Sequence, residues 1–355
     1  MARACEPRLR LQPNFGSLDR PVRILDAEAV RTVLPMADAI EAVRWAYIAA
    51  SAGKAVMPAR IHLSAPASND VTLVMPAFVE ASPDGKFPAS LTVKTVSVHP
   101  GNEALGLATV LGSVLVLDPA TGACLGLVDG ASLTALRTGA GSAAATDALA
   151  RQDAETVTIF GAGAQAESQL RAICAVRQIR RVWVINRTLE RAEQMCKRLS
   201  DTDGIPAKIR VARNAEEALE DADIVCTATG SYRPLFNDCD LKPGVHINAI
   251  GAFRPDMQEI PVETVQRARV FVDHRESVLH EAGDLVQPIR SSAINESHIG
   301  GEVGALLSGE VIGRQDPHEI TLFKSVGMAA QDAVCAAFAL RRACELGIGS
   351  IAKWD

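Results

Sequence analysis

The chain of 355 residues is long enough for two domains, and its apolar content of 48% is enough for sizeable cores. Its formal net charge of −6, with no basic stripe, argues against a nucleic acid as partner. Since no apolar stretch reaches the roughly 18 residues of a membrane span, we expect neither nucleic acid nor membrane among its partners.

The first half of the chain mixes helices and strands. The first twenty residues are basic, are interrupted by Pro7 and Pro13, and predict a poorly ordered extension over residues 1–20 rather than a transit peptide. Residues 26–35 and 36–53 then carry apolar side chains at helical spacing. VTLVMPAFV (71–79), SLTVKTVSV (90–98) and SVLVLDPATGACLGLVDG (113–130) are typical of strands. In the last of these, DPATG supplies turn chemistry and predicts a hairpin, so we expect an antiparallel sheet.

The second half alternates strands with helices. It opens on a helix rich in small residues, 132–150, for which Ser132 is the expected N-cap. Strands are then predicted at VTIF, VWVIN, DIVCTAT, VHINAIG and VFVDH, and the intervening helices include two that Thr188 and Asn214 would cap. Such alternation predicts a parallel, doubly wound sheet. A long apolar helix, 328–346, closes the pattern and should stop at Gly347.

A glycine-spaced turn follows the strand VTIF. The sequence FGAGAQA carries two of the three small residues of the dinucleotide fingerprint as glycines, with Ala166 in the third place. Glycines let the backbone approach a pyrophosphate closely, and the helix that follows offers free N–H groups to it. The residues expected to hold the pyrophosphate are Gly161, Ala162, Gly163, Ala164 and Gln165.

The tip of the next strand bears on which dinucleotide binds. An acid there favours the free ribose hydroxyls of NAD, whereas an arginine accommodates the 2′-phosphate of NADP. VWVIN ends instead at Asn186, Arg187 and Thr188, with Arg191 one helical turn further on. This pattern predicts NADPH, with NADH as a weaker donor. The alternative is that Arg187 is a solvated surface residue and Thr188 only a helix cap.

The eight cysteines include no CxxC pair, and most lie in apolar or helical stretches. Their distribution predicts reduced thiols in a cytoplasmic protein rather than a disulfide framework. We find no metal site in the sequence.

Several ordered blocks resemble the ornithine cyclodeaminase/mu-crystallin family over roughly residues 22–351. They are VMPAF, VKTVSVHPGN, LVDGASLTALRTGA, IFGAGAQA, INRT, HINAIGAFRPDMQE and ITLFKSVGMAAQD. The resemblance implies an α/β fold in which a Rossmann doubly wound domain (139–325) is inserted in an antiparallel α+β domain (21–138 plus 326–355). That second domain would bind substrate and form a homodimer. The implied activity is that of an NAD(P)-dependent oxidoreductase acting on CH–NH or C=N bonds.

The resemblance also implies roles for individual residues. Arg60, Lys94 and Arg137 match the family's carboxylate-binding positions and are our candidates for catalysis. Lys94 shares its strand face with apolar neighbours, and no acid lies near Arg137 in sequence, so each could take up a substrate carboxylate. An ordinary structural ion pair is the alternative for each. Further candidates are Met75, Ser113 and Arg254 on the substrate side, and Thr138, Thr227 and Ser325, together with Arg137, on the cofactor side.

Departures from the cyclodeaminases point to one branch of the family. Ser231 stands where they carry a catalytic acid, and a hydroxyl cannot serve as a carboxylate base. Leu73 stands where they carry the acid for the distal ammonium of the substrate. Lys324, GAFRPDMQE and HEAGD resemble instead the branch that contains mu-crystallin and the cyclic ketimine reductases.

We therefore expect reduction of a small cyclic imino acid, 1-pyrroline-2-carboxylate or 1-piperideine-2-carboxylate, to L-proline or L-pipecolate with NADPH. Lys94 would donate a proton or act only through its charge. The alternatives are an ornithine cyclodeaminase, an alanine or other amino-acid dehydrogenase, a synthase that joins an amino acid to a second carbon skeleton, and a binding protein for a small hormone-like carboxylate. The sequence leaves the ring size open, because one methylene changes binding by about 1–3 kcal/mol.

Overall fold

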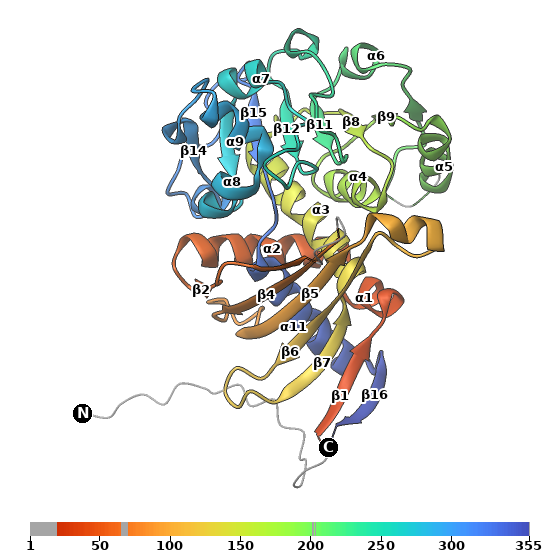
Figure 1. Ribbon diagram of the computed structural model, residues 1–355, viewed down its shortest axis with the longest axis vertical. Helices are drawn as coiled ribbons and strands as arrows, with labels where there is room; N and C mark the ends of the chain where they lie inside the picture. Colours follow the sequence, from red (N-terminus) through yellow and green to blue (C-terminus); the bar gives the residue numbers. More distant parts are fainter. Residues whose placement is uncertain (1–19, 65–69, 201, 203, 355) are drawn as a thin grey trace, which may run out of the picture.

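A computed structural model describes residues 20–64, 70–200, 202 and 204–354 of the chain. The extension expected over residues 1–20 lies outside this part, except for Arg20, with which the first strand begins. The described strands form two sheets, drawn one above the other in Figure 1. No helix of the described ranges has the length and apolar character to cross a membrane.

The first sheet has the order β16-β1-β7-β6-β5-β4-β2, with β3 paired to β4. Its strands are β1 (Arg20–Leu25), β2 (Ala55–Val56), β3 (Ile61–Ser64), β4 (Val71–Val79), β5 (Ser90–Val98), β6 (Val110–Leu117), β7 (Cys124–Asp129) and β16 (Ser350–Trp354). The predicted β6–β7 hairpin is present. The sheet is not wholly antiparallel, because β1 runs parallel to β7. Strand β16 was not foreseen; it follows Gly347, lies at the sheet edge and pairs with β1.

The helices α1 (Ala27–Val33), α2 (Met36–Ser51), α3 (Gly130–Leu149) and α11 (Ala329–Leu346) pack in one core with the first sheet. Helix α11 contacts β4, β5 and β6 and runs behind them in Figure 1. Strand residues therefore alternate between the buried face toward α11 and an outer face. Lys94 lies on the buried face with Thr92 and Val96, as the period of two predicts.

The second sheet is parallel throughout, with the order β10-β9-β8-β11-β12-β15-β13-β14. Its strands are β8 (Thr156–Phe160), β9 (Arg181–Ile185), β10 (Ile209–Val211), β11 (Ile224–Thr227), β12 (His246–Ala249), β13 (Arg269–Val272), β14 (Ile299–Glu302) and β15 (Thr321–Lys324). The connecting helices are α4 (Ala164–Val176), α5 (Leu189–Leu199), α6 (Ala215–Leu219), α7 (Val262–Arg267), α8 (Arg275–Glu281), α9 (Gly283–Arg290) and α10 (Val303–Leu307), with short 3₁₀ turns at Asp238–Asp240 and Glu296–His298. A further 3₁₀ turn, Pro100–Leu105, connects β5 to β6 in the first sheet. The predicted doubly wound sheet is confirmed.

The strand order reverses between β8 and β11. From β8 the chain adds β9 and β10 on one side of the sheet. It then crosses to the other side of β8, where β11 and β12 follow. Ligands of such sheets bind at the carboxyl ends of the strands where the order reverses. The glycine turn that follows β8 lies at this point.

Helix α3 connects the two sheets and is buried along most of its length. Its N-cap is Asp129, whose side chain accepts from Ser132 N at 2.8 Å, so the expectation of Ser132 as the cap was wrong by one turn. Its glycines allow the close packing that the sequence predicted. A Cβ on Gly139 would lie 2.6 Å from Ser168 O, and one on Gly141 would lie 2.4 Å from the Tyr47 hydroxyl.

Candidate active site

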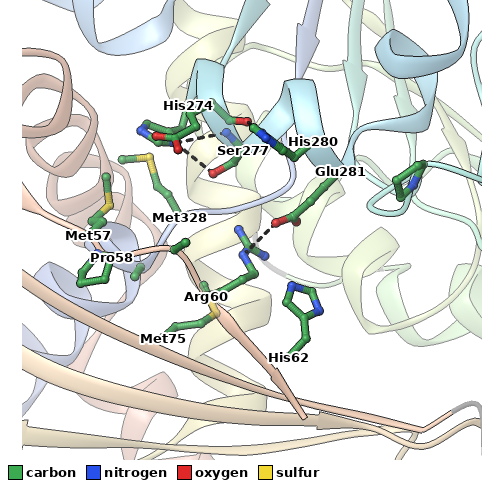
Figure 2. A pocket seen from close by; sticks show the side chains of 14 residues that line it. Met57, Pro58, Arg60, His62, Met75, His274, Ser277, His280, Glu281 and Met328 are labelled. Carbon is green, nitrogen blue, oxygen red and sulfur yellow. Dashed lines mark hydrogen bonds and ion pairs between the residues drawn. The ribbon is translucent and has the colours of Figure 1, made fainter. Parts of the chain in front are cut away.

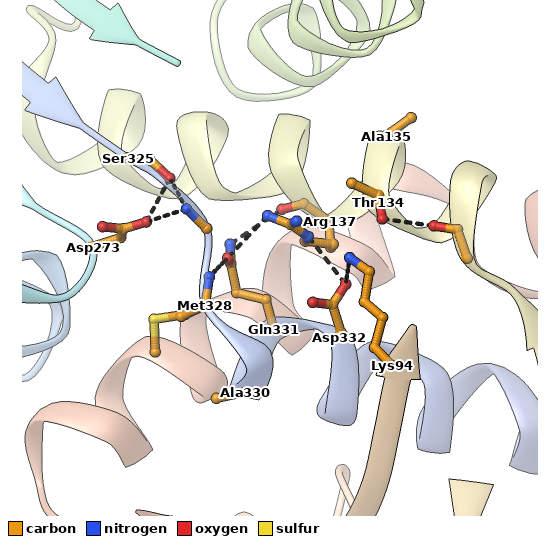
Figure 3. A network of polar contacts seen from close by, with 12 residues as sticks. Lys94, Thr134, Ala135, Arg137, Asp273, Ser325, Met328, Ala330, Gln331 and Asp332 are labelled. Atoms are coloured by element: carbon orange, nitrogen blue, oxygen red, sulfur yellow. Dashed lines mark hydrogen bonds and ion pairs between the residues drawn. The ribbon is translucent and has the colours of Figure 1, made fainter. Parts of the chain in front are cut away.

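One buried carboxylate holds two of the three predicted cations (Figure 3). Oδ1 of Asp332, on α11, accepts from Lys94 Nζ at 2.9 Å and from Arg137 Nε at 3.1 Å. Its Oδ2 makes no hydrogen bond with any described residue. The pair comes from β5 and α3, elements far apart in sequence, so α11 brings the two cations together. Arg137 is held further by Gln331 Oε1, which accepts from its Nη1 at 3.3 Å.

Burial dominates the electrostatics of this group. Lys94 is 1% exposed, and desolvation lowers its pKa to about 8, although the charge of Asp332 acts in the opposite direction. Burial also disfavours the charged form of Asp332. Arg137 and Lys94 outweigh that effect and hold the pKa of Asp332 below its ordinary value. Lys94 is therefore a cation whose charge changes close to neutral pH.

Arg60 lies next to this group and contacts the turn that joins β15 to α11. Its Nη2 donates to Gly327 O at 2.6 Å, and its Nε lies 3.2 Å from Oε1 of Glu281 at the end of α8. On the other side of Gly327, a Cβ would lie 2.5 Å from Arg137 Nη1. The backbone at Gly327 therefore separates two guanidinium groups.

A cavity of about 450 Å³ lies between the first sheet and α8 (Figure 2). Met57, Met75 and Met328 give it an apolar wall, and the ion pair of Arg60 with Glu281 forms part of its polar lining. Burial raises the pKa of Glu281, partly offset by Arg60. Lys94 and Arg137 do not line this cavity, but Met75 is the strand partner of Lys94. The remaining lining residues are Pro58, Ala59, His62, Pro255, His274, Glu276, Ser277, His280 and Ala329.

The turn after β8 leaves room for a ligand. Gly161 has φ +114°, and a Cβ there would lie 2.6 Å from Ala228 O, so this position requires glycine. By contrast, no atom lies within 4 Å of a Cβ on Gly163. Helix α4 begins at Ala164, next to this open space, and Gln165 Oε1 is buried without a hydrogen bond to any described residue. The shape and free N–H groups fit a pyrophosphate.

The tip of β9 is exposed. Asn186 Nδ2 donates to Thr188 O at 2.8 Å, and Arg187 and Thr188 are exposed. Thr188 occupies the N-cap position of α5 as predicted, but its side chain makes no capping hydrogen bond. Its hydroxyl is therefore not used by the helix. Arg191 is exposed on the first turn of α5.

The other predicted site residues fall into two groups. Ser325 and Thr227 are buried at the ends of β15 and β11, where they donate to Asp273 at 2.6 Å and to Glu259 at 2.8 Å. Thr138 is buried on α3 beside Arg137. Two residues are not brought to the cavity within this chain. Ser113 lies on the outer face of the sheet, away from the face that carries Lys94, and its hydroxyl shares a hydrogen bond with Thr95. Arg254 forms an ion pair with Asp256, next to Pro255, which lines the cavity.

Three acids at the centre of the site were missed by the sequence analysis: Asp332, Glu281 and Asp273. Asp332 had a usable signal, since it is the one acid in the otherwise apolar first half of the helix 328–346. Asp273 stands at the end of the predicted strand VFVDH and Glu281 in HEAGD, but neither pattern indicates an ion pair or a place in the site. Their partners are far away in sequence.

Residues 22–345 match the family model of the ornithine cyclodeaminase/mu-crystallin family. The chain belongs to this family. A Δ1-pyrroline-2-carboxylate reductase of Bacillus cereus is 38% identical over 327 residues, which cover 92% of this chain and 98% of that protein. The predicted family and the predicted enzyme class, an oxidoreductase that uses a nicotinamide cofactor, are both confirmed.

Solved structures of the family agree with the fold. The Δ1-pyrroline-2-carboxylate reductase of Thermococcus litoralis, solved with NADH and L-proline, has a TM-score of 0.87 at 37% identity and covers 93% of this chain and 99% of its own. An archaeal alanine dehydrogenase dimer with bound NAD has a TM-score of 0.86 at 31% identity and covers 94% of this chain and 100% of its own. Members with different reactions thus share this framework.

The three sequence markers of the reductase branch meet in one buried network. Lys324 Nζ lies 2.8 Å from Oδ2 of Asp284, the last residue of HEAGD. Oδ1 of Asp284 accepts from the backbone N of Glu259, the last residue of GAFRPDMQE, at 2.7 Å. All three residues are fully buried. Ser231, in contrast, lies in the loop after β11, where its hydroxyl donates to Arg233 O.

We predict that Asp332→Asn destabilises the protein by about 3–5 kcal/mol, because it leaves two buried cations without a counter-charge. The measurement is the free energy of unfolding from urea denaturation. Glu345→Gln on the same helix is the control, since Glu345 is exposed and lies 3.8 Å from Arg341. It should cost about 0–1 kcal/mol. Equal, small effects of both substitutions would contradict a structural role for Asp332.

Proposed function

We propose that this protein reduces a cyclic ketimine, 1-pyrroline-2-carboxylate or 1-piperideine-2-carboxylate, to L-proline or L-pipecolate. The observation that carries the proposal is the grouping of Arg60, Lys94 and Arg137 beside a cavity walled by methionines. The named activity of the Bacillus and Thermococcus relatives supports the same reaction.

The charges favour a carboxylate substrate. Three cations, Arg60, Lys94 and Arg137, are paired with two carboxylates, Asp332 and Glu281, and Lys94 and Arg137 share the one carboxylate of Asp332. The third buried acid, Asp273, accepts from Ser325 and from backbone N–H groups instead. A bound carboxylate would give the two desolvated cations a second anionic partner. Arg60 is the cation that lines the cavity, and it presents a planar pair of donors suited to a carboxylate.

The cavity wall suits a ring. The side chains of Met57, Met75 and Met328 are flexible and polarisable, so they can follow the outline of a small apolar ring. Leu73, where cyclodeaminases carry an acid, is a partly buried residue packed against the core. A ring without a distal ammonium therefore fits this wall better than ornithine does.

The chemistry demands little of the protein. The nicotinamide of a bound cofactor supplies a hydride to the imine carbon. The protein's part is to fix the carboxylate, exclude water and keep the ring nitrogen protonated. Lys94, with a pKa of about 8, can hold a proton near neutral pH, and burial raises the pKa of the nearby Glu281 above its ordinary value. Lys94 is our candidate for the donor, and its charge also serves the carboxylate.

We further propose NADPH as the preferred cofactor. Arg187 and Thr188 are exposed at the tip of β9, where a 2′-phosphate would lie, and no acid stands in the segment Asn186–Thr188. The free side chain of Thr188 adds a hydroxyl donor. Asn186, Arg187, Thr188 and Arg191 would hold the phosphate, and Gly161–Gln165 the pyrophosphate.

The function is tested by mixing the purified protein with NADPH and each cyclic imine and following the nicotinamide absorbance. We expect rapid oxidation of NADPH with a cyclic imine and none with pyruvate plus ammonia. Cyclodeamination of ornithine regenerates its NAD and leaves the absorbance unchanged, so ornithine with NAD is followed by the release of proline and ammonia, of which we expect none. A charge-assisted contact of about 1.5–3 kcal/mol to the 2′-phosphate should make kcat/KM about tenfold or more higher with NADPH than with NADH. Turnover of pyruvate and ammonia alone would favour an alanine dehydrogenase, and silence with every substrate would favour a binding protein.

Lys94 should give the reaction a pH limit. As the pH rises through about 8, Lys94 loses its proton, and KM for the imine should increase by about tenfold per pH unit beyond that point. In Lys94→Arg the guanidinium stays charged, so the increase should disappear even if the overall rate is lower. Lys86→Arg, at an exposed lysine, is the control and should keep the wild-type profile. An unchanged profile in Lys94→Arg would assign the titration to another group.

We also propose a cytoplasmic homodimer. Val93, Leu115 and Leu127 are strand partners on the outer face of the first sheet, opposite α11, and are only partly buried. The archaeal alanine dehydrogenase of similar fold is a dimer. The cysteines of the described residues are free, which fits a reducing compartment.

The dimer predicts a solution mass near twice 37.6 kDa by sedimentation equilibrium. Leu115→Lys should shift the protein toward the monomer, because it puts a charge in the apolar row. Ile312→Lys, at an exposed apolar residue of the other half of the chain, is the control and should leave the mass unchanged. A wild-type particle of 37.6 kDa alone would contradict the proposal.

A further inference from the structure

The turn between β15 and α11 is fixed by a single buried carboxylate. Asp273 follows β13 directly and is 1% exposed. Its Oδ2 accepts from Ser325 Oγ at 2.6 Å, from Val326 N at 3.0 Å and from Gly327 N at 2.7 Å (Figure 3). Its Oδ1 accepts from His274 N at 2.8 Å. Three of its four donors therefore belong to this turn.

Both arginines of the site contact this turn at Gly327. Gly327 O accepts from Arg60, and Gly327 has φ +77° with the Arg137 guanidinium so close that no side chain fits there. A shift of the turn by a fraction of an ångström would break the Arg60 contact or push into Arg137. The other anchors of these arginines, Glu281 and Asp332, lie on α8 and α11 and do not bond to the turn itself.

We propose that Asp273 is a positioning residue, which sets both arginines at the spacing that a substrate carboxylate requires. The proposal rests on the proposed function in that the arginines bind that carboxylate. Asp273 also accepts a hydrogen bond from the hydroxyl of Ser325. By resemblance to the family, Ser325 lies near the nicotinamide, so Asp273 would connect the cofactor side of the site with the carboxylate side. The link lies on the carboxyl edge of the second sheet, at β13 and β15.

The test is Asp273→Asn, which keeps the size of the side chain and removes the charge that holds three donors. We expect KM for the cyclic imine to rise about tenfold or more, since small displacements at a site cost large factors in rate and binding. The dissociation constant of NADPH, measured from its fluorescence, should change less than about threefold, because the pyrophosphate and phosphate contacts are remote from the turn. A substitution that only lowered the stability of the fold would not raise KM for the imine while leaving the dissociation constant of NADPH nearly unchanged.

Asp223→Asn is the matched control. Asp223 is also a buried carboxylate that accepts from two backbone N–H groups, Glu155 and Thr156, at 2.9 and 3.0 Å. It is paired in addition with Arg151 and Lys242, each at 2.7 Å, so its substitution tests the loss of at least as much stability. It precedes β11 and so lies on the opposite edge of the same sheet. Its substitution should lower the melting temperature comparably and leave KM unchanged. Ser325→Ala, which removes one donor without a charge change, should raise KM in the same direction but less, and serves if Asp273→Asn does not fold.

A second readout separates this proposal from the proposed function. Pyrrole-2-carboxylate, a planar analogue of the five-membered imine, is titrated calorimetrically into the protein with NADPH present, so no turnover is needed. Wild-type binding that weakens about tenfold or more in Asp273→Asn supports the positioning role, even if no cyclic imine is reduced. Unchanged affinity in a folded Asp273→Asn overturns it. A wild-type protein that does not bind the probe overturns the assignment of the arginines, and the positioning role with it.

Discussion

The site depends on the ion pairs of Asp332, which join three elements that the sequence keeps far apart. Taking a lysine and an arginine out of water is costly, and the cost is met only when a counter-charge and hydrogen bonds are supplied at the same place. Helix α11 supplies them, and it can do so only if it lies under β4, β5 and β6. The burial of these charges therefore depends on the packing of α11 against the sheet. It leaves Lys94 with a pKa of about 8, so that the interaction that organises the site also sets its protonation.

How much the sequence predicted follows from the range of the interactions involved. The glycine turn, the hairpin at residues 118–122 and the helices with apolar stripes depend on neighbours within a few residues, and these predictions were confirmed. The predicted cap Ser132 was wrong because Asp129, three residues earlier, accepts from the backbone N of Ser132, so the helix begins at Gly130 and Ser132 lies within its first turn. Strand β16 and the parallel pairing of β1 with β7 depend on where the chain returns after α11, which no local pattern encodes.

The same reasoning applies to the site. Arg60, Lys94 and Arg137 were selected as cations in apolar surroundings, but their partners Glu281 and Asp332 lie about 200 residues away along the chain. For each cation, the structural ion pair and the substrate clamp had been weighed as alternatives. The structure contains the ion pairs, yet Lys94 and Arg137 share the single carboxylate of Asp332, which leaves each of them able to bind a second anion. The structural ion pair and the binding of a substrate carboxylate are therefore compatible, since a cation can be held in place by one anion and still bind another.

A second buried network is formed by Lys324, Asp284 and Glu259, which belong to the motifs that resemble the reductase branch. Leu73, a further departure from the cyclodeaminases, lies on β4 two residues before Met75. Lys324, Asp284 and Glu259 hold the ends of β11 and β12, because Glu259 accepts from Thr227, Thr229 and the backbone of Gly251. Ser231 is in the loop that follows β11 and donates to Arg233 O within it. These residues lie outside β5, α3 and α11, which carry Lys94, Arg137 and Asp332. A pyrroline-2-carboxylate reductase and an alanine dehydrogenase share the framework, so the fold of the family does not by itself decide the reaction.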